Sequence, residues 1–321
     1  MQLKSIVTSA MLLAAAVMPQ AAAQDMKKVA LTYIVDHPAI NAAQDGIVAA
    51  LAEAGYAEGE RLELIVQSAQ GSMPTQQQIA REFAGLEPDL MIAISTPSAQ
   101  ALQSIANGIP VVFAAVTDPV GAKLVETLEA PGGNVTGTSD MQPFGPTLEL
   151  IRSLVPAART IGVIYNSGEA NSVSQVEALT AEAKSQGFEI VEATASQSAM
   201  VPDAARSLVG RADVILIPTD STVVSAVEGV VMVGERARIP VFASDTDSVE
   251  RGALAALGFN YFELGKLSGA MAARILGGEA PSSIPVGVLQ TQDLYLNTKA
   301  AAAMGVEVPP GLIASAAKVV E

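Results

Sequence analysis

The chain has 321 residues, no cysteine and a formal charge of −15 at pH 7. The lack of thiols excludes disulfides, thiolate metal sites, cysteine nucleophiles and a lipid-modified cysteine. The acidic balance argues against nucleic acid as a partner, because nucleic-acid binding relies on clustered Lys and Arg.

The N-terminus has the pattern of a secretory signal peptide, residues 1–23. Lys4 supplies a positive charge, an apolar segment follows over residues 6–18, and small residues at Ala21 and Ala23 predict cleavage after Ala23. The apolar segment is shorter than the roughly 20 residues that a membrane-spanning helix needs, which disfavours a permanent anchor. We therefore expect a mature protein that is free in a bacterial periplasm and not membrane-anchored.

Beyond this segment, short apolar runs alternate with segments of helical period, and Gly or Pro separates them. Strands are predicted over residues 29–35, 62–67, 90–94, 111–116, 160–165, 188–193, 214–218, 240–243 and 254–259. Examples of the predicted helices between them are residues 42–54, 98–106, 172–186 and 222–237. The tail adds a helix over 263–276, a strand over 285–290 and a helix over 296–304. This alternation predicts an α/β fold with parallel sheets covered by helices on both faces.

The two halves of the chain resemble each other. The segment IPVVFAAVTDPV, residues 109–120, matches IPVFASDTDSV, residues 239–249, and two earlier pairs of segments match in the same order. We interpret this as one βαβαβ unit used twice, over 27–136 and 137–260, although two α/β segments can also look alike by chance. The tail returns after both units, which predicts two doubly wound lobes joined by a hinge of several strands. Residues 261–290 would join the N-terminal lobe and 291–321 the C-terminal lobe.

Polar residues follow most of the predicted strands. In open α/β sheets ligands bind at the carboxyl ends of the strands, so these residues are candidates for ligand contacts. The candidates are Tyr33, Ser95, Thr96, Ser98, Thr117, Asp118, Tyr165, Asn166, Asp220, Ser221 and Asp245.

The candidates suggest opposite charges on a ligand. Ser95, Thr96 and Ser98 surround the start of a predicted helix, where free N–H groups and the helix dipole favour a carboxylate; simple N-capping of the helix is the alternative. Asp118 and Asp245 would accept an ammonium group, and turn formation is the alternative for Asp118. Together the two sites would recognise an α-amino acid.

Two tyrosines and the one histidine also lie at or just after the ends of predicted strands. Tyr33 and Tyr165 occupy matching strand ends and could form a wall of the site. His37 is the only histidine and cannot form a metal site or a catalytic triad by itself, so we expect a structural or rim position for it. The sequence also lacks the nucleophile-elbow, phosphate-loop and dinucleotide motifs, which argues against an enzyme and against a cofactor or metal.

Several segments resemble a known family. The runs VFAAVTDPVGAKLVETLEAPGGNVTGTSD, GVIYNSGEANS and SVERGALAALGFNYFELGKLSGAMAARILGGE, followed by IPV, are similar to ABC transporter substrate-binding proteins of the tryptophan-binding type. The resemblance covers essentially the whole mature chain. It implies the type I periplasmic-binding fold and closure of two lobes on a small molecule. It also places ligand contacts in the loops that carry all of the candidates above except Tyr33.

We therefore expect a monomeric periplasmic receptor that binds an amino acid and delivers it to an inner-membrane permease and its ATPase. Aromatic amino acids are the candidate ligands. Two alternatives stay open. The closed lobes could instead signal to a membrane receptor, or the chain could be an α/β hydrolase that uses Asp118 or Asp245.

Overall fold

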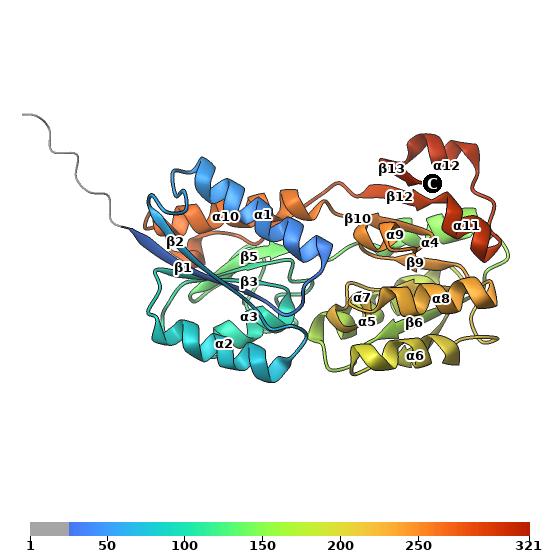
Figure 1. Cartoon of the computed structure of the whole chain (residues 1–321), viewed down its shortest axis with the longest axis horizontal. Coiled ribbons are helices and arrows are strands. Elements are labelled where there is room, and N and C mark those ends of the chain that lie inside the picture. The colour runs from blue at the N-terminus through green and yellow to red at the C-terminus, as the bar shows by residue number, and fades with distance from the viewer. Residues whose placement is uncertain (1–25) are drawn as a thin grey trace, which may run out of the picture.

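Two lobes, each built around its own sheet, lie side by side in the computed structural model, which describes residues 26–321 (Figure 1). The strands of the first sheet are all parallel. Their order is β11 (Gly287–Val288), β5 (Val135–Ser139), β4 (Val111–Ala114), β3 (Leu90–Ile94), β1 (Lys27–Tyr33) and β2 (Leu62–Ser68).

The second sheet is parallel apart from the antiparallel pair of β10 and β12. Its order is β13 (Lys318–Val320), β12 (Asp293–Asn297), β10 (Ala255–Gly258), β9 (Val241–Ala243), β8 (Val214–Ile217), β6 (Thr160–Tyr165) and β7 (Glu189–Thr194). The helices of this lobe are α4 (Phe144–Leu154), α5 (Ala170–Ser185), α6 (Val201–Ser207), α7 (Ser221–Val224), α8 (Val227–Ala237), α9 (Asp247–Glu250), α11 (Thr298–Met304) and α12 (Pro310–Ser315).

Helices cover both faces of the first sheet. Alternate residues along a strand point to opposite faces, and Leu31 and Ile92 pack with helices α1 (Pro38–Glu53) and α10 (Tyr261–Leu276). Ala30 and Phe113 point the other way and pack with α2 (Met73–Gly85) and α3 (Thr96–Gln103). The N-terminus of α1, which follows β1, and the N-terminus of α3, which follows β3, therefore lie on opposite faces of the sheet, at the edge where the strands end.

The chain crosses between the lobes at three places within the described residues. It leaves the first sheet after β5 through residues 140–143, returns after β10 through 259–260, and crosses again between β11 and β12 through 289–292. These crossings form the hinge. The prediction of an α/β fold with two doubly wound lobes and a multi-strand hinge is confirmed.

Some element predictions were wrong. Strand β5 was missed, and the boundary predicted between residues 136 and 137 falls inside it. Its sequence VTGTS is too polar to be recognised as a buried strand, but the fold gives the hydroxyls partners: Thr136 donates to the carbonyl of Ile284 and Thr138 pairs with Ser268. The predicted helix over 296–304 begins only at Thr298, and the predicted helix over 222–237 is interrupted between α7 and α8.

Candidate functional site

The strand ends of both sheets face one cavity between the lobes. Its volume is about 460 Å³, including its opening to solvent. The first lobe contributes residues after β1, β3 and β4, the second lobe contributes residues after β6, β8 and β9, and Asp140 and Tyr261 come from the crossings and α10. Five predicted residues line it: Ser95, Thr96, Thr117, Ser221 and Asp245.

Polar atoms without a partner gather at this cavity. Among residues 26–321, the buried side-chain atoms that lack a hydrogen-bond partner are Ser95 Oγ, Thr96 Oγ1, His37 Nε2, Asn171 Oδ1 and Arg61 Nε. The first four belong to residues that line the cavity. Because buried polar groups in folded proteins are nearly always paired, this concentration makes the cavity the candidate site for a polar ligand.

Ser95 and Thr96 lie at the start of α3. The backbone of Ser95 has φ 79°, in the left-handed region that side chains other than Gly rarely adopt, and its hydroxyl does not cap the helix. The N-capping alternative for this serine is therefore wrong. Strained backbone of this kind occurs preferentially where a ligand is bound, and both free hydroxyls can donate to an anionic oxygen.

Two buried carboxyl groups line the same cavity. Asp245 accepts hydrogen bonds from the backbone N–H of Ser248 at 2.8 Å and from its hydroxyl at 2.7 Å. Asp140 accepts from the hydroxyls of Thr117 and Tyr261, each at 2.8 Å, and burial raises the pKa of its carboxyl group. Asp140 was not predicted, although it follows β5 directly and would have joined the candidates if that strand had been recognised.

The remaining lining is largely apolar. Val35, Ala39 and Ile40 come from the first lobe and Val224 from the second. Cavities that bind small organic molecules combine such surfaces with a few polar groups that fix orientation.

The two predicted tyrosines do not line this cavity. Tyr33 donates to Asp36 at 3.1 Å, and Tyr165 donates to Glu192 at 2.6 Å, which raises the pKa of Tyr165 to about 12. The aromatic side chain that does line the cavity is Tyr261, at the start of α10.

The other predicted residues outside the cavity have structural partners. Ser98 donates to Gln76 at 3.0 Å, behind the start of α3. Asn166 lines a second cavity between the lobes, of about 1280 Å³ including its opening to solvent. Asp220 accepts from the N–H groups of Asn166 and Val223 and caps α7. Burial and the nearby Glu169 raise the pKa of Asp220 to about 7. Ligand contact by these residues stays a prediction.

Asp118 contacts the opposite lobe. Its carboxylate accepts from the N–H of Gly121 at 2.8 Å, as the turn hypothesis predicted, and also from the hydroxyl of Ser174 on α5 at 2.9 Å. Nearby, the hydroxyls of Thr117 and Thr219 lie 3.5 Å apart across the cleft. These contacts join the two lobes across the cleft.

The lobes, the three crossings and the polar cavity between them define a solute receptor with the type I periplasmic-binding fold. The chain belongs to the ABC transporter substrate-binding protein family, whose model matches residues 28–320. This family consists of solute-binding proteins, so the expectation that the chain is not an enzyme is confirmed. Proteins of this family typically work outside the cytoplasm, and residues 26–321 contain no helix long and apolar enough to cross a membrane. The predicted signal peptide lies outside the described residues.

Three relatives are informative. A tyrosine-binding protein of Clostridioides difficile is 44% identical over 271 residues, which cover 84% of this chain and 79% of the relative. A Streptococcus pneumoniae domain solved with L-Trp is 32% identical, with a TM-score of 0.89 over 92% of this chain and 100% of that one. A ligand-free, open substrate-binding protein from Clostridium difficile is 43% identical, with a TM-score of 0.70 over 92% and 99%.

The two solved relatives differ in shape from this chain in the opposite order to their sequence identities. The open relative is more similar in sequence, yet the ligand-bound relative is more similar in shape. The lobes here touch across the cleft, and their arrangement is nearer to that of the ligand-bound relative than to that of the open one.

Proposed function

We propose that this protein is the periplasmic receptor of an ABC importer and that its lobes close on an aromatic amino acid. One observation carries the proposal. The free donors at the cavity, on Ser95, Thr96 and His37, come from the first lobe, whereas the free acceptor on Asn171 and the carboxylate of Asp245 come from the second. A donor wall opposite an acceptor wall matches an amino-acid head group, with its carboxylate on the first lobe and its ammonium on the second.

The relatives support an aromatic side chain. One is named for tyrosine binding and another was solved with L-Trp. In this chain, Val35, Ile40, Val224 and Tyr261 offer apolar surface for a ring beside the polar groups. Closure needs no chemistry, only a higher affinity of the closed state for ligand.

A thermal-shift screen of the twenty amino acids tests the ligand class. At about 100-fold excess over the dissociation constant, a bound ligand stabilises the folded state by about 2.7 kcal/mol and raises the melting temperature. We expect shifts with L-tyrosine, L-tryptophan or L-phenylalanine and none with the D-enantiomers at equal concentration. A screen in which no amino acid shifts the transition would reject the ligand class.

The remaining parts of the proposal concern location and partners. Export by the predicted signal peptide would place a free monomer in the periplasm, where the closed form would dock on an inner-membrane permease coupled to an ATPase. Uptake of labelled amino acid by cells lacking this protein, compared with complemented cells, tests the transport role. Unchanged uptake would favour the signalling alternative.

A further inference from the structure

The side chain of His37 has one nitrogen engaged and one free. It is 4% exposed and precedes α1, where its Nδ1 accepts a hydrogen bond from the backbone N–H of Ala39 at 3.3 Å. A neutral imidazole that accepts at Nδ1 carries its proton on Nε2. Because Nε2 is buried without a partner at the cavity, it is a hydrogen-bond donor available to a ligand.

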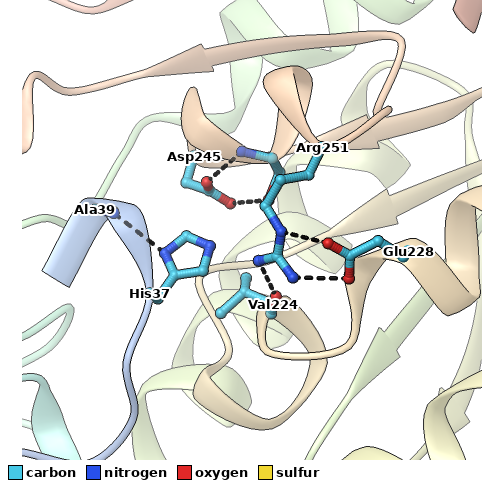
Figure 2. Close-up of polar contacts among 7 residues, drawn as sticks. His37, Ala39, Val224, Glu228, Asp245 and Arg251 are labelled. Carbon is cyan, nitrogen blue, oxygen red and sulfur yellow. Dashed lines mark hydrogen bonds and ion pairs between the residues drawn. The ribbon is translucent and has the colours of Figure 1, made fainter. Parts of the chain in front are cut away.

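The neighbours of His37 come from the other lobe. Figure 2 shows the imidazole near Asp245, Val224 and Arg251, with the Nδ1 side turned toward Ala39. Arg251 forms two 2.7 Å hydrogen bonds with Glu228 and a third, of 2.6 Å, with the carbonyl of Val224. These bonds hold its guanidinium in the second lobe, and Arg251 does not line the cavity.

The environment of His37 favours the neutral form of its imidazole. Burial lowers the pKa of the imidazole below its usual value and Arg251 lowers it further, while Asp245 and Glu228 act in the opposite direction. The side chain thus offers an N–H donor without a positive charge.

No cationic side chain of residues 26–321 lines the cavity to pair with an acidic ligand group. None of the described residues that line it is Lys or Arg. A ligand carboxylate that enters is therefore held by neutral donors, and the buried side-chain donors without a partner at the cavity are the hydroxyls of Ser95 and Thr96 and the Nε2–H of His37.

We propose that His37 binds the α-carboxylate of the ligand through Nε2–H, beside an ammonium group held by Asp245. The carboxylate and the ammonium of an amino acid are attached to the same carbon, so a donor and an acceptor that are neighbours fit both. The assignment rests on the proposed amino-acid function. It makes His37 a determinant of selectivity for amino acids over amines or amides with the same side chain.

Two substitutions separate this role from helix capping. His37→Ser keeps a good N-cap residue, but its hydroxyl is too short to reach the ligand carboxylate. His37→Gln keeps an N–H donor at about the same distance from the backbone as Nε2–H. Calorimetric titration would compare L-tyrosine, L-phenylalanine and L-tryptophan with L-tyrosinamide, which lacks the carboxylate. A hydrogen bond to a charged group corresponds to a change in affinity of roughly tenfold to a hundredfold.

We expect His37→Ser to lose a similar factor with all three amino acids, to discriminate less than wild type against the amide, and to melt close to wild type. His37→Gln should recover part of the affinity. A loss confined to L-tyrosine would show that His37 binds the side-chain hydroxyl, and an unchanged affinity would show that it only caps α1; either result overturns the proposal. If wild type itself bound none of the amino acids, the proposed function would fail as well.

A second measurement uses the fact that the chain contains a single histidine. In protein without a polyhistidine tag, ¹⁵N NMR should show the Nε2–H tautomer and a large shift of the Nε2 resonance on addition of L-tyrosine. A smaller shift is expected with L-tyrosinamide. Equal shifts with both ligands would contradict contact with the carboxylate.

Discussion

At the scale of single residues, the cavity is defined by hydroxyls that have no partner in the protein. Ser95 and Thr96 are buried, yet neither hydroxyl is paired, whereas the neighbouring Ser98 donates to Gln76. A buried polar group without a partner lowers the free energy of unfolding, and a ligand that forms the missing hydrogen bond offsets this loss on binding. We therefore expect substitution by alanine to have opposite effects at Ser95, whose hydroxyl is free, and at Ser98, whose hydroxyl is bonded within the protein.

We expect Ser95→Ala and Thr96→Ala each to weaken amino-acid binding by about tenfold and to leave the stability of the ligand-free protein unchanged or slightly increased. The reason is that each loses a bond to the ligand and no bond within the protein. Calorimetric titration and thermal unfolding measure the two effects.

The matched control is Ser98→Ala, which removes a buried hydroxyl from the same helix. It should lower stability by roughly 1 kcal/mol, because the bond to Gln76 is lost. Since Ser98 does not line the cavity, we expect the affinity of this variant to stay nearly unchanged, a result that would reject the sequence-based prediction of ligand contact by Ser98. If Ser95→Ala were destabilising and bound ligand normally, its hydroxyl would have a structural role instead.

At the scale of elements, glycines allow α10 to lie directly on α1. A Cβ atom at Gly265 would come within 2.0 Å of the carbonyl oxygen of Ala43, and one at Gly269 within 2.6 Å of that of Ile47. Helix α10 follows a crossing, begins with Tyr261 at the cavity and continues toward β11. Its close packing therefore fixes both a residue of the site and the hinge.

Gly265→Ala should destabilise the protein by about 2 kcal/mol or more, because the backbone of α1 cannot move away without disturbing the core. Denaturant unfolding measures this change. The control is Gly85→Ala at the end of α2, where an added Cβ meets nothing within 4 Å; helix propensity makes it neutral or stabilising by up to about 1 kcal/mol. Equal stabilities of the two variants would contradict the close packing.

At the scale of the whole molecule, few direct contacts hold the closed arrangement at the strand ends. The hydrogen bond from Ser174 to Asp118 joins α5 to the first lobe, and the hydroxyls of Thr117 and Thr219 face each other at 3.5 Å. Since ligand and these contacts both favour the closed state, a change in the contacts alone shifts the equilibrium and the apparent affinity.

Ser174→Ala removes the contact between the lobes and leaves Asp118 bound to the N–H of Gly121. A loss of about 1 kcal/mol from the closed state would lower affinity by up to roughly fivefold if the ligand-free protein is mostly open, and would increase its radius of gyration if it is mostly closed. Titration and small-angle scattering measure the two quantities. Ser185→Ala, at the other end of the same helix, should change neither, because its hydroxyl binds only the carbonyl of Glu182. Identical scattering and affinity for both variants would show that this bond does not contribute to closure.

The sequence by itself determined the class of fold and the edge of the sheets at which the site lies. Apolar runs at strand spacing, the repeated half and the polar residues after each strand are local patterns, and parallel sheets place all such strand ends together. Ser95, Thr96, Thr117, Ser221 and Asp245 were found in this way and line the cavity.

Tertiary structure alone decided which of those residues face the cavity and which are occupied elsewhere. Asp140 follows a strand too polar to recognise, His37 reaches the cavity only because α1 begins beside the opposite lobe, and Tyr165 turns to Glu192. Strand spacing places a residue at an edge, but the direction of its side chain depends on hydrogen-bond partners that are distant in sequence. For this reason the polar atoms left without partners, which carry the functional proposal, could be identified only in the folded chain.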